Sequence, residues 1–387
     1  MRYNNYHKHT HYSNIRTIDS IAKPEEYMKR AVELGHTTYF TIEHGFQGNI
    51  YEAYTLCQQY GLKCIYGVEA YYTDDMMDKS NRSVYHIVLI AMTECARKEI
   101  NKIMSIANQE GFYYKPRIDL KCLLSLTPTD TIITSACVAG RLFKNDNWLN
   151  DFFIPVYQHF GKNFMLEVQD HDEKIQIEWN KNILQLKDKY GLKIIHGCDS
   201  HYIKPEDAKY RDMFLRAKGI FYEEESGFIL DYPDDKTIAR RYLEQGVLTK
   251  ENIIEALKNT QIFDNAEGIK LDKEFKIPVI KKEIIENELG IKDTMDENKI
   301  LKKVISKAWK EEKKNIDQSR IREYEQAIYD EINTVEKCGM ARYFIIDNII
   351  VNKAIKKYGA ILTRSGRGSA VSFYINKLLG LTEIDRL

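Results

Sequence analysis

The sequence of 387 residues lacks the long apolar runs that mark membrane proteins. No run of about 18 apolar residues occurs, so no transmembrane helix is expected. The first ten residues, MRYNNYHKHT, contain no apolar stretch of the kind that forms the core of a secretory signal. We therefore expect a protein with no membrane partner.

Paired cysteines are missing as well. The seven cysteines are scattered and odd in number, and none forms a C-x-x-C pair. This pattern argues against a disulfide framework and suits the reducing cytoplasm, where we expect the protein to be located. Proline is also scarce, with seven residues, and no segment has low complexity. Domain boundaries must therefore be placed by changes in composition.

Neither sign of charge is in excess. Lys plus Arg and Asp plus Glu both total 57, and 43% of the residues are hydrophobic. Such a chain is long enough for two or three globular domains. Zero net charge neither supports nor excludes a nucleic-acid partner, because local patches matter more than the sum.

What the sequence does contain, from residue 6 to about 220, is a series of short β-rich runs that alternate with amphipathic helical segments. One helical segment is KPEEYMKRAVELG, in which Pro24 suits the first turn and Gly35 the end. Repeated βα units predict a parallel sheet, and this many units predict a closed barrel. An open doubly wound sheet is the alternative, but no G-x-G-x-x-G follows the first strand. After the first strand, the predicted strands cover residues 37–45, 63–72, 84–91, 131–140, 164–171 and 193–202.

The composition changes after about residue 225. Residues 246–265, 294–338 and 341–359 are charged or apolar-striped and are predicted to be helical. The following run, AILTRSGRGSAVSFYINKLLG, is predicted to form a strand, a glycine-containing turn and a helix. We place the boundaries so that a barrel covers 1–225, a connecting region 226–280, and a smaller helical or α+β segment 281–387.

The run HKHTHYS contains three of the ten histidines within five positions. On an extended strand, alternate side chains share a face, so His7 and His9 could reach one metal ion, with His11 close behind. A solvated histidine run is the alternative. The choice depends on what other residues gather near this strand.

Further ligand-type side chains recur at the strands that follow. In a parallel barrel, functional residues gather at the carboxyl ends of the strands. A single buried histidine is usually a hydrogen-bonded core residue, and a single buried cysteine is usually a small hydrophobe. Their recurrence on successive strands instead favours a zinc, manganese or iron site. The residues are His44, Glu69, His86, Cys137, Asp199 and His201.

These motifs resemble the polymerase and histidinol phosphatase (PHP) domain, and more narrowly that domain in the alpha subunit of bacterial or phage DNA polymerase III. The resemblance is carried by HKHTHYS, TIEHG, GVEAYY, YHIVLIA, GFYYKPRID, TSACVAG, EVQDH and CDSHYIKPEDA. It implies a distorted TIM-like (β/α)7 barrel. The later TRSGRGSA…YINKLLGLTEIDRL resembles the start of the polymerase palm, so the similarity reaches the last residue.

The resemblance also implies a ligand set for two or three divalent ions. Asp19 is the candidate for the ninth ligand, with His11 as its substitute, because Asp19 lies later than in the usual spacing. Glu43 stands where the family usually has Asp and is expected to orient a ligand. The implied ligands are His7, His9, Asp19, His44, Glu69, His86, Cys137, Asp199 and His201. The implied catalytic residues are His7, His9, His44, Glu69, Asp199 and His201.

The activity implied by the resemblance is 3′–5′ exonuclease proofreading at a single-stranded DNA end. Lys115 and Arg117 beside Tyr113 and Tyr114 could contact such a strand, with a packed loop as the alternative. Two other functions stay open, a small-molecule phosphatase of the histidinol-phosphate type and a non-catalytic, metal-stabilised scaffold of the polymerase.

In the family, the run SGRGS contacts the nucleotide triphosphate, which implies Ser365, Gly366, Arg367, Gly368 and Ser369 as nucleotide-binding residues. Glycines before a helix can present amides to an anion. No D-x-D pair follows to hold the Mg²⁺ that the full-length polymerase needs. The chain alone is therefore expected not to polymerise DNA. The implied partners are primer-template DNA, the remainder of the polymerase, and replisome proteins such as the sliding clamp.

Overall fold

The computed structural model describes residues 2–222, 227–272, 274–363 and 368–387. The chain divides into two compact units, Met1–Leu271 and Asp272–Leu387. Each unit has hydrophobic core clusters of its own. None of the helices within the described ranges is long and apolar enough to cross a lipid bilayer.

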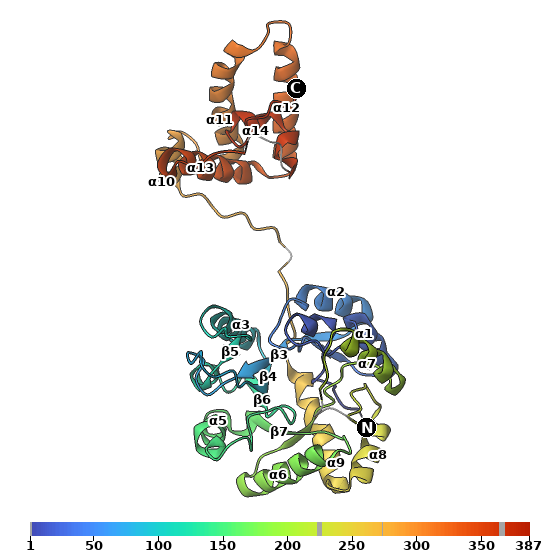
Figure 1. The fold of residues 1–387 in the computed structure, drawn as a ribbon. Coiled ribbons are helices and arrows are strands. Elements are labelled where there is room, and N and C mark those ends of the chain that lie inside the picture. Colours follow the sequence, from blue (N-terminus) through green and yellow to red (C-terminus); the bar gives the residue numbers. More distant parts are fainter. Residues whose placement is uncertain (1, 223–226, 273, 364–367) are drawn as a thin grey trace. The chain divides into compact units, whose positions relative to one another are not determined.

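Short parallel and antiparallel strands form the centre of the first unit (Figure 1). β1 and β2 pair in parallel, and the other strands form one sheet in the order β5-β3-β4-β6-β7-β8. The strands are β1 (Thr38–Phe40), β2 (Lys63–Ile65), β3 (Gly67–Tyr72), β4 (Tyr85–Ala91), β5 (Arg117–Ile118), β6 (Thr131–Thr134), β7 (Phe164–Val168) and β8 (Ile194–His196).

Isolated bridges extend this sheet on both sides toward a closed barrel. Beyond β1, His44 bridges to Glu69 of β3. Beyond β8, Ser200 bridges to Lys8, and the His9 amide donates to the Ser200 carbonyl at 2.8 Å. At the seam between the N-terminal segment and the segment after β1, the Thr10 hydroxyl donates to Glu43 at 2.6 Å.

The interior of the barrel is a separate apolar cluster to which nearly every strand contributes. Its members are mostly aliphatic and fully buried, as expected when alternate residues of each strand face inward. The cluster contains Tyr6, Phe40, Ile42, Ile65, Val88, Ile90, Ile132, Ala136, Met165, Ile195, Phe263 and Ala266. A barrel of the α/β class is therefore the fold of this unit.

The prediction of a parallel sheet is wrong for β4. This strand pairs antiparallel with both of its neighbours, β3 and β6. The connection from β3 to β4 holds no helix, so the chain turns back at once instead of crossing over. The reversal matters for the site, because it brings the first residues of β4 to the end where the other strands finish.

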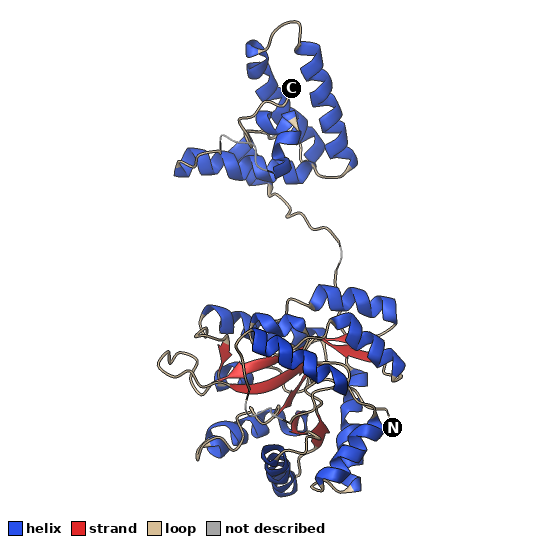
Figure 2. Ribbon diagram, turned by 45° about the vertical axis from the view of Figure 1, so that its right-hand side comes forward, coloured by secondary structure: helices blue, strands red, loops and turns tan. Residues whose placement is uncertain are grey.

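Helices surround the strands of the first unit (Figure 2). Pro24 opens the first of them, as predicted, and Gly61 and Gly191 end two others in the left-handed conformation. Residues 227–271 belong to this unit, and α9 packs against β8. The helices are α1 (Pro24–Glu33), α2 (Ile50–Tyr60), α3 (Glu94–Gln109), α4 (Leu120–Leu124), α5 (Ile154–Phe160), α6 (Lys174–Tyr190), α7 (Ala208–Ala217), α8 (Asp235–Gln245) and α9 (Lys250–Asn259).

The second unit is helical in the residues that the structure describes. Its core includes Ile300, Leu301, Ile345 and Tyr374. The strand predicted after Gly359 is wrong for residues 360–363, because no neighbouring strand offers hydrogen bonds and Ile361 is 90% exposed. The helices are α10 (Lys282–Leu289), α11 (Glu297–Glu312), α12 (Ile321–Lys337), α13 (Ala341–Tyr358) and α14 (Tyr374–Leu378), with the 3-10 helix η8 (Gly368–Ser372).

Candidate metal centre

His7 and His9 lie on the N-terminal segment that runs beside Ser200. The rings of His7 and His9 are fully buried with centroids 5.4 Å apart. Lys8, between them, points to another part of the molecule, where its Nζ lies 3.8 Å from the centroid of the Tyr39 ring. The alternation predicted from the sequence therefore places the two imidazoles together.

Glu69 is the carboxylate around which the histidines gather. The residue lies on β3 and is almost fully buried. Its Oε1 lies 3.2 Å from His7 Nε2 and 2.9 Å from His86 Nδ1. Its Oε2 lies 3.3 Å from His9 Nε2 and also contacts His44 Nδ1. One carboxylate thus faces four imidazoles.

Asp19, not His11, joins the cluster. Asp19 Oδ2 lies 2.6 Å from His44 Nε2 and 3.3 Å from His201 Nε2. His11 lies in the 3-10 helix η1 (His11–Ile15), where its ring packs against Tyr12. Of the two alternatives for the ninth ligand, the geometry favours Asp19.

Asp199 and Cys137 occupy the turns that follow β8 and β6. Asp199 has a φ of 48°, a conformation that Asp tolerates better than most residues, and its Oδ1 lies 3.2 Å from His9 Nε2. The Cys137 sulfur lies 3.7 Å from His86 Nδ1. All nine ligand candidates from the sequence therefore lie in one connected cluster.

Burial and neighbouring charges shift the pKa values of the clustered side chains. Burial and the neighbouring His44 lower the pKa of His9 to about 3, which leaves the imidazole neutral. Burial alone would raise the pKa of Glu69, but the surrounding histidines, His86 first, hold it well below its usual value. Burial, followed by the charges of Asp199 and Glu69, raises the pKa of the Cys137 thiol. A bound cation would reverse this last effect.

Several buried ligand-type atoms in the cluster have no hydrogen-bond partner among the described residues. They are His9 Nε2, Asp19 Oδ1, His44 Nδ1, Glu69 Oε2 and Asp199 Oδ1. Buried polar atoms are normally hydrogen-bonded, so a concentration of ligand-type atoms that face one another without hydrogen-bond geometry is unusual. The side chains fit metal ions, which would bind these lone pairs.

Glu167, which supports His7, and Ser13, which supports His9, were not singled out in the sequence. Glu167 Oε1 lies 2.7 Å from His7 Nδ1, and Glu167 also accepts a hydrogen bond from the Tyr6 hydroxyl. Glu167 lies on β7, two residues after the core residue Met165. A charged residue on the inward parity of an apolar strand was the signal that could have identified it.

Glu43 acts on His9 through Ser13. The Ser13 hydroxyl donates to Glu43 at 2.6 Å and lies 3.3 Å from His9 Nδ1. Because this hydroxyl donates to Glu43, it accepts from Nδ1–H of His9 and leaves Nε2 free as a ligand atom. The expected role for Glu43, orienting a ligand, is thus indirect.

For Arg117 and Lys115 the structure favours the alternative, a packed loop, although Tyr114 beside them is exposed. Arg117 is fully buried and donates to the carbonyls of Gly111, Asn81 and Met76. Lys115 Nζ donates to Thr17 Oγ1 at 2.7 Å. Phosphate contacts by Arg117 are therefore contradicted.

Only part of the predicted nucleotide-binding run can be placed. Ser365, Gly366 and Arg367 lie outside the described residues. Gly368 and Ser369 begin the five-residue 3-10 helix η8, which buries none of its residues. The predicted α-helix directly behind the glycines is thus replaced by a short 3-10 turn, and α14 begins only at Tyr374.

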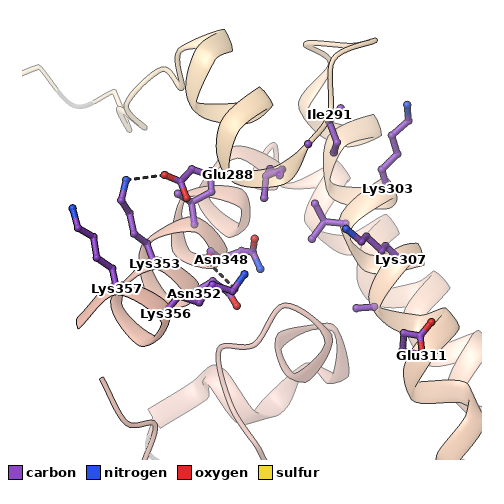
Figure 3. Close-up of a pocket in the computed structure, with 15 residues that line it drawn as sticks. Glu288, Ile291, Lys303, Lys307, Glu311, Asn348, Asn352, Lys353, Lys356 and Lys357 are labelled. Carbon is purple, nitrogen blue, oxygen red and sulfur yellow. Dashed lines mark hydrogen bonds and ion pairs between the residues drawn. The ribbon is translucent and has the colours of Figure 1, made fainter. Parts of the chain in front are cut away.

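Elsewhere in the second unit, lysines line a groove of about 900 Å³ between α11 and α13 (Figure 3). Lys353 pairs with Glu288 at 2.7 Å across one edge of the groove. The sequence did not reveal this groove, because its lysines belong to two helices that are separate in the chain. The lysines are Lys303, Lys307, Lys353, Lys356 and Lys357.

Comparison with known proteins agrees with this geometry. Residues 5–171 match the PHP domain, and residues 299–387 match the bacterial DNA polymerase III alpha NTPase domain. The DNA polymerase III alpha subunit of Aquifex aeolicus is 28% identical over 98% of this chain and 33% of its own length. The DNA-directed DNA polymerase of Bacillus phage SPbeta is 23% identical over 98% of this chain and 34% of its own length.

The chain spans about a third of the length of these two relatives. Among solved structures, an amidohydrolase from Chromobacterium violaceum aligns with a TM-score of 0.37 at 14% identity, over 51% of this chain and 88% of its own. The first unit is a PHP domain and the second matches the polymerase NTPase domain. The chain therefore belongs to the DNA polymerase III alpha family, of which it represents an N-terminal region.

Proposed function

We propose that the PHP domain of this chain is a metal-dependent 3′–5′ exonuclease that removes nucleotides from single-stranded DNA ends. The observation that carries the proposal is the cluster of buried ligand-type atoms without hydrogen bonds at one end of the barrel. The family match supports DNA as the substrate. In this proposal the domain acts in the cytoplasm, together with the remainder of a polymerase and replication proteins such as a sliding clamp.

Three overlapping groups of ligand atoms support the binding of more than one ion. Within each group the ligand atoms lie within 4.8 Å of one another. The groups are His9–His44–His201, His7–His9–Glu69 and His44–Glu69–His86. We propose two or three ions of zinc, manganese or iron, the metals that accept imidazole, carboxylate and thiolate ligands. Asp19, Cys137 and Asp199 complete the ligand set.

Bound metal ions would supply an acidified water and stabilise negative charge on the phosphate and the leaving oxygen. The reaction is a hydrolysis. The water oxygen forms a bond to phosphorus while the bond from phosphorus to the 3′ oxygen of the preceding nucleotide breaks. The products are a nucleoside 5′-monophosphate and a strand shortened by one, whose new 3′-hydroxyl receives a proton.

The side chains of this protein hold and orient the site. Glu167 and Ser13 fix the proton on Nδ1 of His7 and His9, so that each Nε2 faces the centre. Glu69, whose pKa the surrounding histidines hold low, stays charged and would be one of the residues that hold the ions. Both carboxylate oxygens of Glu69 are directed at histidines on different strands, which makes its position depend on the whole barrel.

The experiment that tests the proposal measures metal content and hydrolysis together. Protein purified without chelator should hold more than one metal ion per chain and should shorten 5′-labelled single-stranded DNA stepwise from its 3′ end. His9→Ala and Asp199→Ala should each lose the metal and at least about 100-fold in kcat/KM, because each change removes a ligand.

Three other outcomes are informative. Faster turnover of a small phosphomonoester than of DNA would indicate a phosphatase instead. Metal retention without turnover of either substrate would indicate a scaffold. Full DNA hydrolysis by His9→Ala, with metal still bound, would contradict the ligand assignment.

A further inference from the structure

The candidate metal centre opens into a cavity of about 460 Å³ with two different walls. Ligand-type side chains, among them His44, His86 and Asp199, form one wall. Aromatic and apolar side chains form the other, including Phe221, Tyr222 and Phe228. Phe221 is 77% exposed, so its ring is not part of the hydrophobic core of the barrel.

A second cavity of about 360 Å³ lies against α7 and shares this aromatic wall. Phe221, Tyr222 and Phe228 line both cavities. Because the same side chains line both, the two cavities adjoin each other at these rings. A ligand longer than one nucleotide could therefore pass from the first cavity into the second.

The aromatic wall is held in place by contacts on its far side. The Phe228 ring stacks on His171 with centroids 4.4 Å apart and an angle of 12°. The Tyr222 hydroxyl donates to the Ile18 carbonyl at 3.1 Å. A fixed aromatic surface suits stacking of a nucleic-acid base, an interaction worth about 1–3 kcal/mol per base.

The second cavity adds positive charge from α7. Arg211 is buried, and its Nε donates to the Asp19 carbonyl at 2.6 Å, which ties it to the protein itself. Arg216, also in the cavity wall, is exposed and has no carboxylate within ion-pair distance among the described residues. Asp212 lines the same cavity on the exposed side of the helix. Arg216 is the cation that remains for a ligand.

We propose that the two cavities form one track for the 3′-terminal nucleotides of a single strand. The terminal nucleotide lies in the metal cavity, a base beside the scissile phosphate stacks on Phe221, and the next phosphate toward the 5′ end contacts Arg216. The inference rests on the proposed function, because it takes the scissile phosphate to lie at the metal centre. Duplex DNA does not enter, since bases stacked inside a duplex present no free face to the rings.

Binding tests the track without requiring turnover. Fluorescence anisotropy with fluorescein-labelled (dT)10 should show a Kd raised by about fivefold or more in Phe221→Ala and in Arg216→Ala. Both side chains are exposed, so neither change should unfold the domain. Met213→Ala and Lys209→Ala, on the same helix but in neither cavity wall, are the matched controls and should bind as the wild type does.

Chain length tests where Arg216 acts. A dinucleoside monophosphate contains only the scissile phosphate, whereas a trinucleotide with two phosphates also offers one to Arg216. The wild type should therefore have a higher kcat/KM for the trinucleotide, and Arg216→Ala should remove that increase. Equal kcat/KM for both substrates in the wild type would overturn the track.

The two proposals fail in different ways. If the metal-loaded wild type binds (dT)10 through Phe221 and Arg216 but hydrolyses no DNA, the exonuclease proposal is wrong and the track stands as a binding site. If hydrolysis proceeds while both variants match their controls in binding and in length dependence, the track is wrong and the exonuclease proposal stands.

Discussion

Single side chains decide how the ligands are presented, and Glu167 is the clearest case. Its carboxylate is fully buried and is held by Tyr6, Thr134 and Gln169 as well as by His7. A carboxylate in this position fixes both the tautomer and the ring orientation of a ligating histidine. The candidate metal site therefore depends on a residue that lies behind His7 and is not among the nine candidate ligands.

Replacing Glu167 with Gln should weaken metal binding about 10- to 100-fold while every ligand stays in place. Competition with a chromophoric chelator measures the change directly. Glu178→Gln, on the exposed face of α6, is the matched control and should leave the affinity unchanged. An unaltered affinity in Glu167→Gln would show that the ring of His7 is held by packing alone.

A second prediction at this scale concerns His36, which is buried away from the ligands. Its Nδ1 lies 2.7 Å from the Tyr232 hydroxyl. Burial, with Arg2 and then Arg30 nearby and only Asp235 opposing, lowers its pKa from 6.5 to about 4. Between pH 6.5 and 4 the unfolded chain binds a proton that the folded chain does not, so stability falls as the pH falls through this window.

The stability of the wild type relative to His36→Gln should therefore decrease by up to about 3 kcal/mol between pH 7 and pH 4. Urea unfolding of both proteins in chelator, at several pH values, gives this difference and cancels the contributions of other groups. A difference that does not change with pH would mean that the pKa of His36 is the same in the folded and the unfolded chain.

At the scale of strands and helices, the direction of β4 accounts for the position of His86. His86 is the second residue of β4, so in a parallel strand it would lie at the opposite end of the barrel from Asp199. The antiparallel pairing with β3 and β6 brings it to Glu69 instead. His86 was named as a candidate ligand from its residue type, and the structure brings it to the cluster although the expected strand direction was wrong.

The approach of β8 to β7 requires a glycine at position 197. A Cβ built there would lie 2.3 Å from Glu167 Oε1, and Glu167 has no open space to move into. Gly197→Ala should therefore displace Glu167 and weaken metal binding at least about tenfold, although no ligand changes. Competition with a chromophoric chelator, as for Glu167→Gln, measures this loss of metal affinity.

Gly61→Ala provides the contrast. Gly61 ends α2 with a φ of 66° and has no atom within 4 Å of a built Cβ. This change should cost about 1 kcal/mol of stability through backbone strain while metal affinity stays the same. If both variants lost metal to the same extent, general destabilisation, and not contact with Glu167, would be the cause.

At the scale of the whole molecule, the two units contain separate cores, and the ligands all lie in the first. Metal binding should therefore stabilise only residues 1–271. The tryptophans allow this to be measured, because Trp148 and Trp179 lie in the first unit and Trp309 in the second.

In Trp309→Phe, fluorescence reports the first unit, and chelator should lower its melting temperature by about 5 °C or more. In the double variant Trp148→Phe, Trp179→Phe, fluorescence reports the second unit, and chelator should have no effect. Equal shifts in both proteins would mean that the two units unfold as one.

The sequence by itself determined the candidate ligand types, the approximate positions of the strands along the chain and the change to a helical second unit. Those features follow from local chemistry, because imidazoles on alternate residues, apolar runs and glycine stops are written in consecutive positions. Only the tertiary structure decided which distant residues meet. In the structure Asp19, and not His11, joins the cluster, and Glu167 and Ser13 lie behind the histidines. Arg117 is buried, and β4 runs antiparallel to its neighbours. Such choices depend on which side chains fill one closed barrel together. Contacts between separate segments, as between His7 and Glu167, leave no local pattern in the sequence.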